Sequence, residues 1–173
     1  MTYQEFLKTK ELQTIEVGFE VNPEYLTDSL FPFQKDIVSW ACRKGKSAVL
    51  IGCGLGKTII QLSWAEQVYR HTGKSVLIIA PLSVVEQTIR EAQKFGISKV
   101  TNCRCDEDVQ EGLNITNYEM VDRLDVSRFI AVVLDESSIL KSFTSKTTAD
   151  FTQRFYRTPY KSKSLSTVLS FTT

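Results

Sequence analysis

The segment from Ala48 to Thr58 constrains the fold more than any other part of the chain. Four apolar residues, Ala48 to Ile51, are followed by the glycine-rich run Gly52-Cys53-Gly54-Leu55-Gly56 and then by Lys57-Thr58 at the start of a helical pattern. A continuous apolar run is typical of a strand buried on both faces. A glycine loop between such a strand and a helix predicts a phosphate-binding loop, although the strict G-x-x-x-x-G-K-[ST] spacing would place a glycine where the chain has Ile51.

Each residue type in this loop has a physical reason to bind a nucleotide. The glycines, Gly52, Gly54 and Gly56, let backbone N–H groups turn toward phosphate oxygens, and the N-terminus of the following helix adds its dipole. Lys57 can place its charge on the β- and γ-phosphates of ATP, and the Thr58 hydroxyl can bind Mg²⁺. The alternative interpretation is a glycine-rich turn that precedes a lysine by chance.

A pair of carboxylates follows another apolar run later in the chain. The run Ile130-Ala131-Val132-Val133-Leu134 predicts a buried strand, and Asp135-Glu136 come directly after it. Because ligands bind at the carboxyl ends of parallel strands, we expect Asp135 to hold the Mg²⁺ shell and Glu136 to orient or deprotonate the attacking water. Alone, such a pair could equally be a solvated turn, but a phosphate-binding loop in the same sheet favours the functional interpretation.

Strand and helix patterns alternate along the chain and predict an α/β fold. Strand-length apolar runs occur at residues 48–51, 76–80, 99–101, 113–116 and 130–134. Helical patterns begin at Pro32 and end at Gly45, and others cover 57–70, 83–95 and 118–124, with Ser83-Val84-Val85-Glu86 as a predicted capping box. Because the strands are continuously apolar rather than alternating, we expect a mostly parallel sheet with helices on both faces.

The two ends of the chain depart from this pattern. Residues 1–30 are acidic, with two Lys and six Asp or Glu, and are predicted to pack on the core through Phe6, Leu7, Phe19 and Tyr25. Residues 161–173 are rich in Ser and Thr and fit either a final strand or a loose tail. Basic residues near this end could follow a nucleic-acid backbone or form a solvated face: Lys141, Lys146, Arg154, Arg157, Lys161 and Lys163.

Two further groups of residues give weaker signals. Phe33 could stack on an adenine ring and the Gln34 amide could bind its edge, the alternative being core packing for Phe33 and plain surface for Gln34. Ser83 and the run Thr116-Asn117-Tyr118 are candidates to complete a nucleic-acid groove with the basic residues.

Composition excludes several protein classes. The net charge is only +1, so the chain as a whole is not a polybasic nucleic-acid binder. Apolar runs are too short to span a membrane, and the first residues show no signal-peptide core. The four cysteines, at 42, 53, 103 and 105, have neither a disulfide-like spacing nor a zinc-ligand set. We therefore expect a cytoplasmic protein.

Taken together, five motifs resemble those of superfamily 2 helicases in their order along the chain. They are Phe33-Gln34, Gly54-Leu55-Gly56-Lys57-Thr58, the segment 80–87 (APLSVVEQ), Thr116-Asn117-Tyr118-Glu119 and Leu134-Asp135-Glu136. The GLGKT and APLSVVEQ forms look most like the Swi/Snf-like branch of double-stranded DNA translocases, and the segments around Tyr3 and Leu30 look like phage-type helicases. The resemblance covers most of residues 1–161.

The resemblance implies an N-terminal ATP-binding lobe with a RecA-like three-layer sandwich. Residues 31–160 would form the lobe, after the lead-in of 1–30 and before the tail of 161–173. It assigns adenine recognition to Gln34, phosphate binding to motif I from Gly54 to Thr58, and nucleic-acid backbone contacts to Ser83 and Thr116. The predicted catalytic residues are Lys57 of motif I and Glu136 of motif II, and Thr58 and Asp135 are the predicted Mg²⁺ ligands. Asn117 is adjacent to Thr116 and is predicted to share its role.

The chain also departs from the family pattern. Ser137-Ser138 stand where the family usually has Ala-His or Ala-Asp, and motif III is absent or degraded. The second lobe, which supplies the arginine finger, is expected in trans or in a part missing from this chain. The implied function is an ATP hydrolase lobe of a DNA helicase or double-stranded DNA translocase. Alternatives left open are a nucleotide-gated DNA- or partner-binding module without turnover, and a P-loop kinase.

Overall fold

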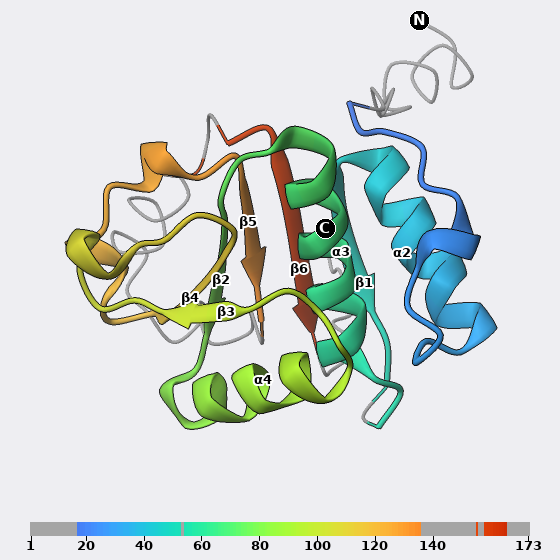
Figure 1. Ribbon diagram of the computed structural model, residues 1–173, viewed down its shortest axis with the longest axis horizontal. Helices are drawn as coiled ribbons and strands as arrows, with labels where there is room; N and C mark the ends of the chain where they lie inside the picture. Colours follow the sequence, from blue (N-terminus) through green and yellow to red (C-terminus); the bar gives the residue numbers. More distant parts are fainter. Residues whose placement is uncertain (1–16, 53, 136–154, 156–157, 166–173) are drawn as a thin grey trace, which may run out of the picture.

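The protein folds around one six-stranded parallel sheet. The computed structural model describes residues 17–52, 54–135, 155 and 158–165. Within them the sheet has the order β1-β6-β5-β2-β4-β3, and every described pair of neighbours is parallel (Figure 1). The strands are β1 (Lys46–Leu50), β2 (Val76–Ala80), β3 (Val100–Asn102), β4 (Leu113–Asn117), β5 (Ala131–Leu134) and β6 (Tyr160–Leu165). The predicted α/β fold with a parallel sheet is therefore confirmed.

The central strands are buried on both faces because their side chains alternate between two apolar clusters. In β2, Val76, Ile78 and Ala80 enter one cluster, whereas Leu77 and Ile79 enter the other. All three described α-helices contribute to the first cluster; they are α2 (Pro32–Lys44), α3 (Lys57–Thr72) and α4 (Leu82–Lys94). The described cover of the second cluster consists of short segments, among them the 3₁₀ turns η3 (Val121–Arg123) and η4 (Val126–Arg128) and the residue Phe155.

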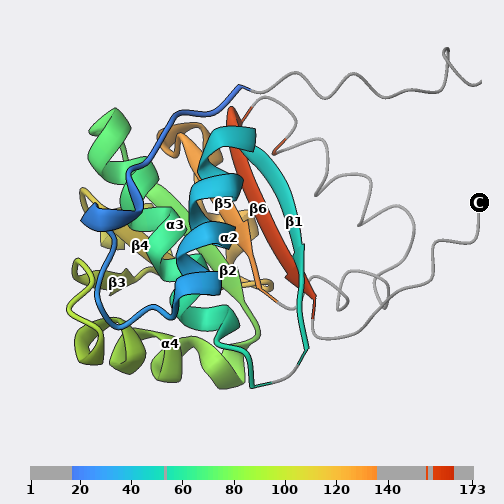
Figure 2. The ribbon, with the colours of Figure 1, turned by 90° about the vertical axis from the view of Figure 1, so that its right-hand side faces the viewer.

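The strand that precedes the glycine loop differs from its prediction. Val49 is buried, but Ala48 and Leu50 are exposed. The reason is that β1 lies at the edge of the sheet, so the expectation of burial on both faces was wrong, while that of a strand was right. Its inner neighbour is β6, seen beside β1 in Figure 2.

The strand β6 answers one question that the sequence left open. Residues 161–165 complete this strand, which pairs with both β1 and β5. The start of the Ser/Thr-rich segment therefore belongs to the sheet, as the final-strand alternative predicted. Residues 166–173 lie outside the described residues.

Helix ends agree only partly with their predicted signals. Pro32 starts α2, and Gly45 follows its end with φ +70°, as predicted. The capping box at Ser83 is wrong, because α4 already begins at Leu82 and its N-cap residue is Pro81. Ser83 therefore lies in the first turn of the helix, where its side chain is exposed.

The acidic lead-in packs on the core only partly through the side chains that were predicted. Phe19 packs against the first apolar cluster, as expected, but Tyr25 is 74% exposed. The 3₁₀ turn η1 (Pro23–Tyr25) ends at Tyr25, and Leu26 and Leu30 are buried in its place. The predicted contacts of Phe6 and Leu7 lie outside the described residues. No helix in the described ranges is long and apolar enough to cross a membrane.

Candidate nucleotide site and nucleic-acid face

The glycine loop connects the carboxyl end of β1 to the N-terminus of α3. Gly54 and Gly56 both have φ +78°, a backbone conformation that residues with a Cβ rarely adopt. Gly56 is the N-cap residue of α3, so Lys57 and Thr58 occupy the first turn of a 16-residue helix. Free backbone N–H groups, a helix N-terminus and a lysine thus coincide at the carboxyl edge of the sheet, as a phosphate-binding loop requires.

Gln34 lies beneath this loop rather than on the surface. Its side chain is only 3% exposed, its Nε2 donates to the carbonyl of Leu55 at 2.9 Å, and its Oε1 accepts from the N–H of Phe31 at 2.9 Å. Phe33 is 43% exposed, and Phe31 and Phe33 stack with a ring distance of 6.2 Å. The alternative interpretation, a buried Phe33 and a surface Gln34, is therefore wrong: Gln34 is the buried residue and Phe33 is exposed.

The end of β5 is connected to the phosphate-loop helix by a side chain that the sequence analysis did not single out. Gln61, which is 4% exposed, donates from Nε2 to Oδ1 of Asp135 at 2.8 Å. Gln61 is one helical turn after Thr58, so the two side chains share a face of α3. The signal that could have found it is this spacing: a polar residue three positions after the threonine in an otherwise buried helix.

The donor set at this place fits Mg²⁺. A threonine hydroxyl and one carboxylate are sufficient protein ligands for this ion, which keeps several waters and is shared with substrate phosphates. Thr58 and Asp135 are the two predicted ligands, and Gln61 places them on the same side of α3. The predicted base Glu136, the residues Ser137-Ser138 and the basic residues 141–157 lie outside the described residues.

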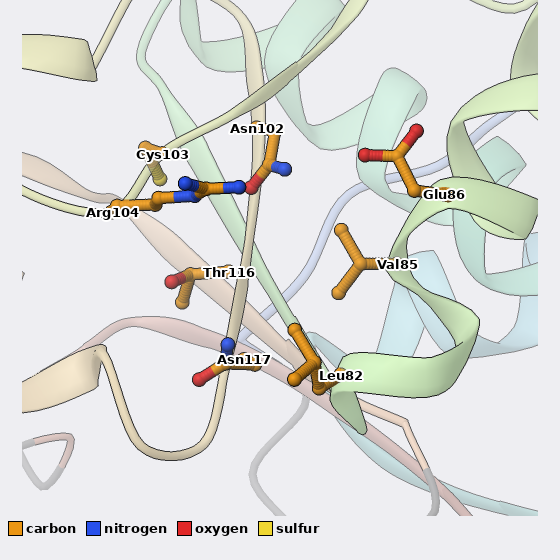
Figure 3. A pocket seen from close by; sticks show the side chains of 8 residues that line it. All are labelled: Leu82, Val85, Glu86, Asn102, Cys103, Arg104, Thr116 and Asn117. Atoms are coloured by element: carbon orange, nitrogen blue, oxygen red, sulfur yellow. The ribbon is translucent and has the colours of Figure 1, made fainter.

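The predicted nucleic-acid residues gather at a neighbouring part of the same edge. Thr116 and Asn117 end β4 and line a cavity of about 140 Å³ together with Leu82 and Val85 of α4 (Figure 3). Ser83 is exposed in the first turn of that helix. Thr116, by contrast, is only 1% exposed, so it reaches this face as part of a cavity wall and not as a surface side chain.

Tyr118 connects the two candidate regions. Its hydroxyl donates to the backbone carbonyl of Asp135 at 2.6 Å, and the N–H of Asp135 donates to the carbonyl of Ile79 at 2.8 Å. The residue after the Thr116-Asn117 pair is therefore bonded directly to the candidate Mg²⁺ ligand. Nothing in the sequence alone indicates this contact, because it joins positions that are 17 residues apart.

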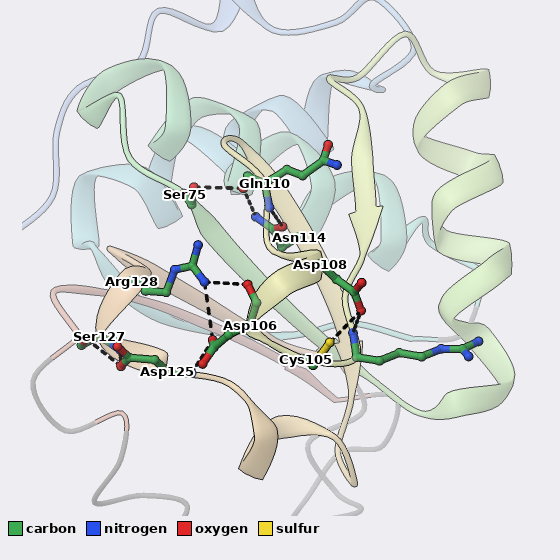
Figure 4. Close-up of polar contacts among 10 residues, drawn as sticks. Ser75, Cys105, Asp106, Asp108, Gln110, Asn114, Asp125, Ser127 and Arg128 are labelled. Atoms are coloured by element: carbon green, nitrogen blue, oxygen red, sulfur yellow. Dashed lines mark hydrogen bonds and ion pairs between the residues drawn. The ribbon is translucent and has the colours of Figure 1, made fainter.

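A polar network fixes the segment that follows β3 and has a structural role (Figure 4). Asp108 accepts from the N–H of Arg104 at 2.9 Å and from the thiol of Cys105 at 3.4 Å, which lowers the pKa of its carboxyl. Asp106 accepts from the N–H of Asp125 at 2.8 Å. Burial raises the pKa of the Cys103 thiol to about 11, so it is neutral. No group of three His, Cys, Asp or Glu side chains within the described ranges could hold a metal ion.

Comparison with known proteins gives one match in sequence and many in structure. No family model matches the chain. The chain is 30% identical over 141 residues to the mouse (Mus musculus) DNA annealing helicase and endonuclease ZRANB3, an alignment that covers 71% of this chain and 13% of the relative. The chain thus spans about an eighth of the length of that curated relative.

Solved helicase structures share the fold. The UvsW helicase from bacteriophage T4 matches 96% of this chain with a TM-score of 0.68 and 14% identity, over 61% of its own length. The Sulfolobus solfataricus SWI2/SNF2 ATPase core in complex with double-stranded DNA matches 87% of the chain with a TM-score of 0.67 and 18% identity, over 34% of its own length. The comparisons confirm the resemblance that the motifs predict: this chain is similar in fold to one part of solved helicases, one of them a SWI2/SNF2 ATPase core, and in sequence to a mouse DNA annealing helicase.

Proposed function

We propose that this chain is the ATP-binding lobe of a DNA helicase or double-stranded DNA translocase, which couples ATP hydrolysis to nucleic-acid remodelling when paired with a second lobe. The observation that carries the proposal is the hydrogen bond from Gln61 to Asp135. It joins the helix that begins at the glycine loop to the carboxylate at the end of β5. The bond supports the proposal because it would keep the proposed phosphate-binding and metal-binding groups on one side of α3, as nucleotide hydrolysis requires.

The glycine loop has an open backbone and an available lysine charge, and both favour binding of the phosphates of ATP. Gly52 and Gly54 are exposed, and a Cβ at Gly54 would meet nothing within 4 Å, so the backbone is open to an incoming phosphate. Lys57 has no ion-pair partner in the part of the chain that the structure describes, so its charge is available to the β- and γ-phosphates. Thr58 and Asp135 would hold Mg²⁺, and Phe33 with Gln34 would lie on the adenine side.

The proposed binding of nucleic acid rests on the residues at the end of β4 and the start of α4. Thr116 and Asn117 end β4 at the same carboxyl edge of the sheet as the glycine loop, and Ser83 lies in the first turn of α4. Tyr118, the residue after Asn117, bonds to the carbonyl of Asp135. The SWI2/SNF2 neighbour was solved with double-stranded DNA, and the mouse relative is named as a DNA annealing helicase. A phage origin, with work in the host cytoplasm, is part of the proposal; one structural neighbour is a bacteriophage T4 helicase, with which the chain shares its fold.

Phosphate release tests this proposal through Glu136. The 173-residue chain is assayed with Mg²⁺-ATP, with and without a short DNA duplex. We expect slow turnover, because the arginine that faces the γ-phosphate would come from the second lobe and is worth about 10³–10⁵ in rate. Glu136→Gln keeps the shape of the side chain and removes the base, so turnover should fall by about 10²-fold or more while ATP binding persists.

The matched control is Glu20→Gln, an exposed glutamate outside the site, which should keep the wild-type rate. Equal turnover by the wild type and Glu136→Gln would contradict the proposed hydrolysis. ATP binding without turnover by the wild type, even with DNA, would favour the nucleotide-gated module instead.

A further inference from the structure

Gln61 is a buried polar side chain of α3, and folding alone gives no reason for an amide at this position. It is 4% exposed and stands between the buried apolar residues Ile60 and Leu62. A buried amide costs free energy unless it is hydrogen-bonded, whereas an apolar side chain of similar size would pack there without that cost. The presence of the amide is therefore explained by what it binds.

Another buried polar residue of the same helix shows what a purely structural role looks like. The Glu66 carboxylate accepts from the N–H and the hydroxyl of Ser98 at 3.0 and 2.8 Å, and it pairs with Arg70 at 3.1 Å. These bonds hold the segment that follows α4, and Glu66 lies about 13.5 Å from Lys57 along the helix axis. Gln61, by contrast, bonds to the carboxylate at the carboxyl edge of the sheet.

The backbone of Asp135 is fixed at two points. Its N–H donates to the carbonyl of Ile79 at 2.8 Å, and its carbonyl accepts from the hydroxyl of Tyr118 at 2.6 Å. A fixed backbone still leaves the carboxylate its side-chain torsions, and each rotamer places the two oxygens differently. The amide of Gln61 restrains these torsions, because Nε2 donates to Oδ1 at 2.8 Å. The orientation of the carboxylate is thus set from α3, the helix that carries Thr58.

We propose that Gln61 is a positioning residue for the metal, which holds the Asp135 carboxylate in the orientation that binds Mg²⁺ together with Thr58. The inference rests on the proposed function. Thr58 precedes Gln61 by about 4.5 Å along the helix axis, on the same face of α3. Groups that orient metal ligands in this way are worth about 10- to 100-fold in metal affinity. Gln61 acts through Asp135 and needs no contact with the metal or the nucleotide.

Calorimetric titration of ATP in the presence of Mg²⁺ and in EDTA separates metal positioning from phosphate binding. Gln61→Met removes the amide at nearly constant length, so the affinity for Mg²⁺-ATP should fall about 10- to 100-fold. The affinity for ATP in EDTA should not change, because the glycine loop and Lys57 remain. Lys57→Ala, by contrast, should weaken binding under both conditions.

Two further variants control this measurement. Gln67→Met is the matched control, because Gln67 is a glutamine of the same helix that is also buried, at 8% exposed, and lies farther from the glycine loop. It should bind ATP as the wild type does under both conditions. Gln61→Asn keeps an amide but is one carbon shorter, so it should lose the bond and reproduce the loss seen in Gln61→Met. Thermal denaturation checks that each variant is folded.

A double-mutant cycle with Asp135→Asn tests whether Gln61 acts through Asp135. Asparagine keeps an oxygen that can accept from Gln61 but lacks the charge that binds Mg²⁺. In this background Gln61→Met should cause no further loss of affinity for Mg²⁺-ATP, because the carboxylate that it positions is gone. A further loss of about 10-fold would overturn the proposal, since Gln61 would then act on another group.

The remaining outcomes distinguish this inference from the proposed function. Unchanged affinity of Gln61→Met for Mg²⁺-ATP would overturn the inference and leave the proposed function standing. Equal losses in Mg²⁺ and in EDTA would also overturn it, because the amide would then support the loop and not the metal. Equal binding of ATP by the wild type under both conditions would reject a metal at this site and keep the phosphate-binding loop. No binding of ATP by the wild type would contradict the proposed function itself, and this inference with it.

Discussion

At the scale of single residues, the two loop glycines with positive φ are required for different reasons. Gly54 and Gly56 share φ +78°, but a Cβ at Gly54 would enter open space, whereas a Cβ at Gly56 would collide with Nε2 of Gln34. The buried Gln34 therefore excludes every side chain larger than hydrogen at Gly56. Backbone conformation alone explains the glycine at position 54. Position 56 requires glycine for its backbone conformation and also because Gln34 leaves no room for a Cβ.

Alanine at these two positions should separate the two effects. Gly54→Ala should lower the free energy of unfolding by about 1–2 kcal/mol, the cost of a left-handed conformation for a residue with a Cβ. Gly56→Ala should cost more, because Gln34 must also give up its bond to Leu55. Urea denaturation of both variants measures the difference, and equal losses would show that Gln34 moves aside without cost.

At the scale of elements, helix and strand positions were predictable where apolar periodicity is strong. The predicted segments 76–80 and 57–70 correspond to β2 and α3 within two residues. The capping box failed because α4 begins at Leu82 and its N-cap residue is Pro81, two residues before Ser83. The contacts Gln61–Asp135 and Tyr118–Asp135 could not be predicted, because each depends on which strands become neighbours.

Removal of the Tyr118 hydroxyl should show what the link between β4 and β5 contributes. Tyr118→Phe leaves the Asp135 carbonyl without this donor, so the free energy of unfolding should fall by about 1–2 kcal/mol. Tyr25→Phe is the matched control, because that side chain is 74% exposed and should be neutral. Urea denaturation checks both; equal stabilities for the two variants would show that the Tyr118 bond contributes nothing.

At the scale of the whole molecule, the sequence predicted the fold class but not the order of the strands. The glycine loop, the apolar strands and the Asp135 position together indicated a parallel sheet with a site at its carboxyl edge. The strand β6 lies between β1 and β5, although its polar sequence resembles a tail. Strand order follows from backbone pairing and from which helices cover each face, and neither is encoded by local composition.

The central claim, that the glycine loop binds the phosphates of ATP, is tested most directly by calorimetric titration of Mg²⁺-ATP into Lys57→Ala. The lost charge-assisted hydrogen bonds are worth about 1.5–3 kcal/mol, so the affinity should fall by about 10- to 100-fold. Lys46→Ala, an exposed lysine at the opposite end of β1, is the matched control and should bind as the wild type does. Equal affinity of the wild type and Lys57→Ala for Mg²⁺-ATP would contradict the claim.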